Sequence, residues 1–316
     1  MANSIYVAGY EANSNNIYVA KYWKDKQPTE LSDGNRQAYT TGIHITQNED
    51  VYVSGAEIST TTIYYRAMYW KNGIPHYLSD GTTNGVANDI CVIGDDTYIC
   101  GEVETSFSNY VAHYWKNGQP VTLGLAGVGT YANAITVVNG DVYVAGYEVS
   151  PITSLYTPVY WKNDVRIPLS DPDEYYIVHD IFVDDNNNIF IAGVNLKNGV
   201  WIGVVWRNGI VNYINDSEIC SVCVFPKKNE LFFAGRIINT NRNSSATVWK
   251  NYIPTKLTTD KYNALAKSIK IHNIKKYTAG NIERKQINIA VYWENRILRR
   301  LTDGKKNAYA TDIFIR

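Results

Sequence analysis

The run Val142-Tyr-Val-Ala-Gly-Tyr-Glu148 decides the fold of this chain, because close copies of it recur along the whole sequence. Its alternating pattern and its β-branched and aromatic content predict a strand. The glycine of this run recurs seven times, at Gly9, Gly55, Gly101, Gly146, Gly193, Gly235 and Gly280. A tryptophan recurs in step with it, with gaps of 43 to 47 residues, at Trp23, Trp70, Trp115, Trp161, Trp206, Trp249 and Trp293. Two independent markers therefore indicate seven repeated units.

Each unit contains four predicted strands. The glycine strand is followed, after a polar loop, by a tryptophan strand such as Ala112-His-Tyr-Trp-Lys116. The next two residues, Asn117 and Gly118, favour a type I′ hairpin turn, in which both residues take positive φ. A short third strand ends at a breaker such as Leu78-Ser-Asp-Gly81, and the unit closes on a strand such as Val86-Ala-Asn-Asp-Ile-Cys-Val92. Four strands in about 45 residues, without a helical period, are typical of propeller blades.

The two ends of the chain predict how the ring closes. The sequence begins at the glycine strand and ends on a strand at Ala310 to Ile315, which supplies the strand missing from the first unit. Closure removes the exposed edges that an open array of sheets would carry. We therefore predict an all-β, seven-bladed β-propeller with four-stranded antiparallel blades, in which residues 1–316 form a single domain and the C-terminal strand pairs with the N-terminal blade.

The repeat resembles bacterial β-propeller repeat proteins that carry VYVAGYE, YWKNG, LSDG and ATDIFV segments. The resemblance extends from Ile5 to Ile315. Members of that family are largely uncharacterised, so the resemblance implies the fold and no catalytic residues.

Composition restricts the partners. Thirty basic residues balance thirty acidic ones, so no overall field attracts nucleic acid. No apolar run reaches the ~18 residues that span a bilayer, and we expect a monomer that does not insert into membranes. No secretory signal is visible, which predicts a cytoplasmic protein, or a secreted or cell-surface one if a leader was removed.

Function is expected where the units differ, in loops on one face of the ring. Aromatic residues are frequent near that face, and the proposed binding residues are Tyr39, Tyr131, Tyr176, Trp201 and Tyr309. They could form a rim for sugar rings or for apolar groups of a protein partner. The alternative is that they pad the contacts between blades.

Three aspartates, Asp89, Asp180 and Asp312, share one position on the innermost strands. If they reach the central channel, their carboxylates could bind a cation. The alternative is that they accept hydrogen bonds from backbone amides near strand ends. No other metal site is predicted.

Two further patterns carry less chemistry. The segment Gly127 to Ala132 matches a dinucleotide fingerprint, but a strand rather than a helix follows it, so we expect no cofactor. Cys91 and Cys100 are predicted to face each other across a hairpin centred on Asp95 and Asp96, as free thiols or as a disulfide.

These observations favour a non-catalytic binding or interaction module, with a protein or glycan ligand on the loop-bearing face. The alternative is a hydrolase or lyase with its site at the channel mouth. The adjacent pair His179 and Asp180 is the candidate for that chemistry. A buried histidine bonded to a carboxylate at the mouth would favour the enzyme.

Overall fold

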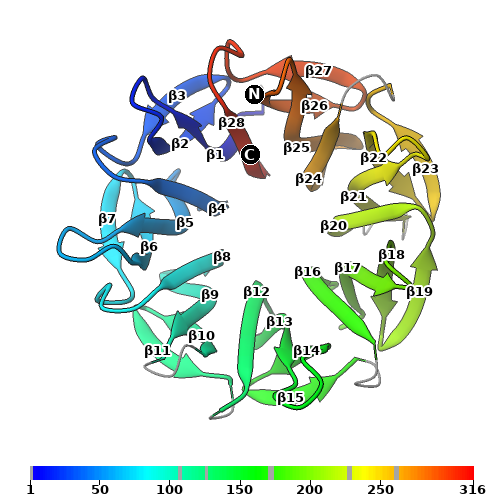
Figure 1. Ribbon diagram of the computed structural model, residues 1–316, viewed down its shortest axis with the longest axis horizontal. Coiled ribbons are helices and arrows are strands. Elements are labelled where there is room, and N and C mark those ends of the chain that lie inside the picture. Colours follow the sequence, from blue (N-terminus) through cyan, green and yellow to red (C-terminus); the bar gives the residue numbers. More distant parts are fainter. Residues whose placement is uncertain (1–2, 106–108, 125–126, 170–173, 226–229, 260–262) are drawn as a thin grey trace.

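The computed structural model describes residues 3–105, 109–124, 127–169, 174–225, 230–259 and 263–316. Within these ranges the chain forms 28 strands, and none of it is a helix that could cross a membrane. The strands make seven four-stranded antiparallel sheets, arranged as blades around a central opening (Figure 1). The predicted seven-bladed propeller is confirmed.

The blades are numbered along the chain, and each is given from its inner to its outer strand. Blade 1 contains β28 (Ala308–Ile315), β1 (Ile5–Ala12), β2 (Tyr18–Lys24) and β3 (Gln27–Glu30). Blade 2 contains β4 (Ala38–Ile45), β5 (Val51–Ile58), β6 (Tyr65–Lys71) and β7 (Ile74–Tyr77). Blade 3 contains β8 (Gly85–Ile93), β9 (Asp96–Glu104), β10 (Tyr110–Lys116) and β11 (Gln119–Thr122). Blade 4 contains β12 (Gly129–Val138), β13 (Asp141–Val149), β14 (Tyr156–Lys162) and β15 (Val165–Pro168). Blade 5 contains β16 (Tyr175–Val183), β17 (Ile189–Lys197), β18 (Val200–Arg207) and β19 (Ile210–Ile214). Blade 6 contains β20 (Ser217–Phe225), β21 (Glu230–Ile238), β22 (Ser244–Lys250) and β23 (Ile253–Lys256). Blade 7 contains β24 (Ala264–His272), β25 (Lys275–Arg284), β26 (Ile287–Glu294) and β27 (Ile297–Arg300).

The C-terminal strand closes the ring as predicted. β28 pairs antiparallel with β1, from Ile5 opposite Ile315 to Glu11 opposite Ala308. Beyond the ladder, the backbones of Ser4 and Arg316 exchange hydrogen bonds of 2.7 and 3.0 Å. Both termini therefore lie in blade 1 (Figure 1).

The repeated tryptophans form the contacts between blades. All seven are at most 1% exposed, and each packs in a cluster that joins its own blade to the preceding one. Trp161 of blade 4, for example, shares a cluster with Tyr98 and Cys100 of blade 3. Burying a side chain of this size stabilises the fold by about 2–3 kcal/mol, so the repeat encodes the seven interfaces directly.

The repeated glycines are required by a close backbone approach. A Cβ added to Gly146 would overlap the carbonyl oxygen of Tyr131 on the adjoining inner strand. The same overlap occurs in the other blades, for example between Gly9 and Tyr309. The glycine thus allows the inner strand to bulge beside it.

The predicted pairing of Cys91 with Cys100 is wrong. Gly94 takes a φ of 59°, and the turn forms at Gly94 and Asp95, one residue earlier than expected. Cys91 consequently lies opposite Tyr98, and Cys100 lies opposite Asp89. Both cysteines are free.

Candidate functional site

A bulge interrupts each of the seven inner strands at the same place. The ladder to the neighbouring strand skips one residue in six strands and two in β4. The skipped side chains line one cavity of about 370 Å³ at the channel mouth, and they are Thr41, Asn88, Asn133, His179, Cys220, Lys267 and Thr311. We call these seven residues the bulge ring. The position after the bulge is Asp in three blades and Ser in two, whereas the bulge ring holds five residue types, as expected of a site built on a repeated scaffold.

The three aspartates lie directly after the bulge ring and also line this cavity. Each accepts a hydrogen bond from the next inner strand, at Ile135 N for Asp89, Val222 N for Asp180 and Ile43 N for Asp312. Similar bonds join every pair of adjacent blades around the ring, including Thr41 Oγ1 to Ala87 O, Asn133 Nδ2 to Val178 O, Ile269 N to Ser221 Oγ and Ser268 Oγ to Asp312 Oδ1. The carboxylates therefore link blades, as the second interpretation of the sequence predicted.

The positive charge near these aspartates comes from Lys270 of β24. Burial alone lowers the pKa of Lys270, but the attraction of Asp312, Asp180 and Asp89 outweighs it and raises the pKa. Burial, together with the charge of Asp312, raises the pKa of Asp89 to about 7. No group of three His, Cys, Asp or Glu side chains in the described parts of the chain is placed to hold a metal ion.

A second and larger cavity, of about 1230 Å³, opens on the same face across blades 5, 6, 7 and 1. We call it the funnel. Trp201 lies on its blade 5 wall, and Tyr10 and Tyr309 lie on its blade 1 wall. The funnel and the smaller cavity share Tyr10, Lys267 and Thr311, so they meet at the channel mouth.

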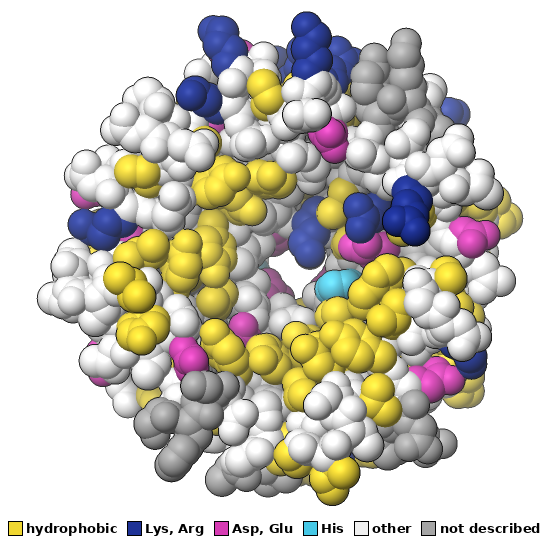
Figure 2. Space-filling model, in the orientation of Figure 1, with side chains coloured by type: hydrophobic (Ala, Val, Ile, Leu, Met, Phe, Trp, Pro, Cys, Tyr) yellow, Lys and Arg dark blue, Asp and Glu magenta, His cyan; other side chains and the backbone are white. Residues whose placement is uncertain are grey.

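Cationic side chains lie between the two aromatic walls. Arg236 of β21 and Lys267 of β24 line the funnel. Arg236 is held by Glu218, with Nη2 and Nε at 2.6 and 2.9 Å from Oε2. Figure 2 shows basic side chains gathered on the side of the mouth over β20 and β24, and hydrophobic ones over β4, β8 and β16. One side of the mouth is therefore basic and the other side is hydrophobic.

His179 of the bulge ring is neutral near pH 7. Burial, together with the nearby charge of Lys267, lowers the pKa of His179 to about 3. The carboxylate of its neighbour Asp180 instead accepts hydrogen bonds from Ser221 Oγ at 2.6 Å and Val222 N at 2.9 Å. Within the described residues, no carboxylate forms a hydrogen bond with His179, so the bonded pair that would favour an enzyme is not formed.

The predicted aromatic residues separate into three groups. Trp201 and Tyr309 line the funnel, and Tyr39 lines the smaller cavity. Tyr131 lies outside both cavities. Tyr176 is only 2% exposed, and its hydroxyl donates to Glu174 Oε2 at 2.7 Å, so the placement of Tyr176 on the binding face is wrong.

Tyr131 belongs to a ladder of stacked rings across blades 3 to 5. Neighbouring centroids are 4.1 to 5.5 Å apart along the series Tyr110, Tyr131, Tyr147, Tyr156 and Tyr175. Because these rings cover one another's faces, little flat surface is left for a ligand. The ladder supports the interpretation that Tyr131 pads the contacts between blades.

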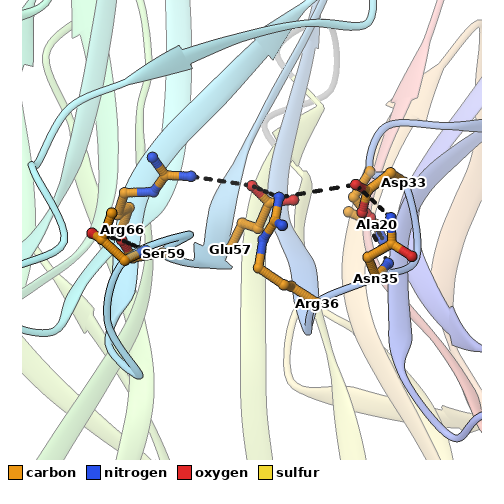
Figure 3. Close-up of polar contacts among 9 residues, drawn as sticks. Ala20, Asp33, Asn35, Arg36, Glu57, Ser59 and Arg66 are labelled. Atoms are coloured by element: carbon orange, nitrogen blue, oxygen red, sulfur yellow. Dashed lines mark hydrogen bonds and ion pairs between the residues drawn. The ribbon is translucent and has the colours of Figure 1, made fainter.

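An ion-pair network lies on the same face but outside both cavities (Figure 3). Glu57 of β5 lies 3.4 Å from Arg66 and 3.9 Å from Arg36, and Arg36 also lies 3.9 Å from Asp33. Burial raises the pKa of Glu57, against the attraction of the two arginines. The network joins the loop after blade 1 to blade 2 and has a structural role.

Sequence reasoning missed Tyr10, Arg236, Lys267 and Lys270. The signal for Lys267 was the variable position directly before the shared aspartate position, as in Ala266-Lys-Ser-Ile269 and Ala310-Thr-Asp-Ile313. Tyr10 and Arg236 share another variable position, directly after the repeated glycine.

No protein-family model and no curated protein matches the sequence, so the resemblance to the bacterial repeat family stays a prediction. Solved propellers do match the fold. An acylaminoacyl peptidase from Pyrococcus horikoshii is 11% identical with a TM-score of 0.57, over 95% of this chain and 50% of the peptidase, so the chain spans half of that protein's length.

Two other solved structures match over nearly their whole length. The propeller domain of the Trilobed protease from Pyrococcus furiosus is 8% identical with a TM-score of 0.56, over 95% of both chains. A polysaccharide lyase of family PL25, an ulvan lyase, is 10% identical with a TM-score of 0.57, over 100% of this chain and 92% of the lyase. Identities this low show the fold alone, and these relatives include both peptidases and a lyase.

Proposed function

We propose that this protein is a carbohydrate-binding module that holds an oligosaccharide in the funnel. The observation that carries the proposal is the pair of aromatic walls, Trp201 on one side and Tyr10 with Tyr309 on the other, around a cavity of about 1230 Å³. Tyr10 and Tyr309 contact each other, with ring centroids 5.1 Å apart, but unlike Tyr131 both line the cavity. Flat aromatic rings offer apolar faces to sugar rings and, in tyrosine, a hydroxyl for hydrogen bonding.

The polar lining of the funnel supports the same ligand class. Side-chain amides line it from blades 6 and 7, at Asn239, Asn263, Asn281 and Asn288. Asn288 Nδ2 also donates to Tyr309 Oη at 3.0 Å, which fixes that ring. Amides both donate and accept hydrogen bonds, as sugar hydroxyls require. A concave polar surface favours a small extended ligand over a flat protein surface.

The enzymatic alternative has less support. His179 has no bonded carboxylate among the described residues, and both oxygens of Asp180 accept hydrogen bonds from the scaffold. A PL25 ulvan lyase of similar fold is bound to -[GlcA(1-4)Rha3S]- in its own structure. At 10% identity this is an analogy of fold. It supports ligand binding by a protein of this fold, and it gives no support to catalysis by this chain.

A glycan array followed by titration calorimetry on the strongest ligand tests the proposal. Trp201→Ala should weaken binding at least tenfold, within the range of about 1–3 kcal/mol for an aromatic anchor. Tyr252→Ala is the matched control, because Tyr252 is 39% exposed in a turn at the opposite face. Failure of every glycan to bind, or equal affinity for Trp201→Ala and wild type, would refute the proposed function.

A further inference from the structure

Lys267 forms no ion pair within the part of the chain that the structure describes. Lysines near the turns of the opposite face pair with a carboxylate, as in Lys162 with Asp141 at 2.8 Å and Lys116 with Asp96 at 3.4 Å. Lys267 has no carboxylate within 4 Å in the described parts of the chain, although Glu218 is near enough to interact with it through space. Lys267 is therefore a cation at the channel mouth that no ion pair among the described residues holds in place.

The other members of the bulge ring are neutral hydrogen-bonding groups, while the carboxylates of the same cavity, Asp89, Asp180 and Asp312, accept backbone hydrogen bonds and interact with Lys270. The other six members of the bulge ring are two threonines, two asparagines, a cysteine and a histidine. Burial keeps His179 uncharged and raises the pKa of Cys220 to about 12, so neither is charged at neutral pH. A cation among neutral donors in a cavity is complementary to an oxyanion, because the attraction is strong where water is partly excluded.

The position of Lys267 connects this charge to the funnel. Lys267 and Thr311 line both cavities. Arg236 lines the funnel nearby, and Glu218 occupies only its Nε and Nη2 atoms. A ligand held between the aromatic walls would therefore place a substituent against Lys267, with Arg236 on the same side.

We infer that the funnel is selective for oligosaccharides that carry an acid group, a carboxylate or a sulfate ester, and that Lys267 binds this group where the two cavities meet. The inference rests on the proposed function and adds the ligand's charge. Thr311 Oγ1 and the free donors of Arg236 complete the site. Carboxylate and sulfate present the same oxyanion chemistry, and only binding data separate them.

Calorimetry with three oligosaccharides of equal length, one neutral, one uronate-containing and one sulfated, tests the inference. Wild type should bind at least one acidic chain tenfold or more tightly than the neutral chain. Lys267→Met should remove this preference, whereas Lys116→Met, at the opposite face, should keep it. The tighter of the two acidic chains identifies the acid group.

Inorganic sulfate is a second ligand that requires no sugar. Sulfate at constant ionic strength should raise the melting temperature of wild type more than that of Lys267→Met, which corrects for the general stabilising effect of the salt. Equal affinity for neutral and acidic chains would overturn the inference and leave the glycan function intact. A sulfate effect that depends on Lys267, without binding of any sugar, would retain the anion site and refute the glycan function. Binding of neither would refute both.

Discussion

Replacing Asp312 by Ala tests how much the ring of inter-blade hydrogen bonds stabilises the propeller. The carboxylate accepts from Ile43 N of blade 2 at 3.0 Å, from Ser268 Oγ of blade 7 at 2.5 Å and from Ile313 N of its own strand at 2.8 Å. Two of these bonds cross the blade boundaries beside the closing strand. Asp312 is therefore the side chain that links the two neighbours of blade 1.

The expected loss follows from these bonds. A hydrogen bond to a charged group contributes about 1.5–3 kcal/mol, so the two cross-blade bonds give about 3–6 kcal/mol. Asp312 lines a cavity that water can enter, and water can replace part of what is lost. We therefore expect Asp312→Ala to lower the free energy of unfolding by about 3 kcal/mol, at the lower end of that range.

Guanidinium denaturation at pH 7, followed by tryptophan fluorescence, measures this change, because all seven repeated tryptophans lie in the blade contacts. Asp185→Ala is the control, since Asp185 is exposed in the turn between β16 and β17, and it should change stability by less than about 0.5 kcal/mol. A loss below about 1 kcal/mol in Asp312→Ala would show that apolar packing alone holds the blades together.

Three further changes have expected outcomes. Deletion of residues 308–316 exposes the edge of β1 and one face of the core, so the truncated chain should aggregate or melt far lower; a soluble monomer with an unchanged melting temperature would contradict the role of closure. Gly146→Ala should prevent folding, or lower the free energy of unfolding by several kcal/mol, because the added Cβ overlaps Tyr131 O. Gly129→Ala should be tolerated in the same melting assay, because its Cβ would meet its nearest atom at 3.5 Å. The pKa of Asp89 is raised from 3.8 to about 7, so its contribution to stability is present below pH 4 and is lost as pH rises through 7. In urea titrations the stability advantage of wild type over Asp89→Asn should shrink by at most about 4 kcal/mol from pH 4 to pH 8, and a constant difference would show that Asp89 does not titrate in this range.

The fold could be predicted because its two determinants recur in every blade. A tryptophan that fills a blade contact and a glycine that permits a bulge serve the same purpose seven times, so their spacing is visible without an alignment. The strand at residues 310–315 completes the count, and this is why closure could be predicted as well.

The aromatic face was harder to predict because a single residue of register reverses a side chain. Tyr131 lies opposite Tyr147, one residue after Gly146, and the same position of β16 is held by Ile177 opposite Val194. Tyr176 lies one residue before this position, so its side chain points into the core. Tyr175 lies two residues before it, so its side chain is on the side of the strand that carries the stacked tyrosines. Comparison of the registers of the repeated units would have excluded Tyr176 from the binding face.

A variable position marks Lys267 in the sequence, but the direction of its side chain depends on the bulge. In a regular strand Lys267 and Ser268 would point to opposite faces, and a lysine would then face the packed contact between blades. The bulge in β24 turns both side chains to the same cavity. The residue that the bulge inserts can change without disturbing the tryptophan contacts, since this residue does not pair with the neighbouring strand. The same geometry places one variable side chain at each of seven positions around one opening, so the repeated strand that stabilises the propeller also provides a site whose chemistry can vary independently of the fold.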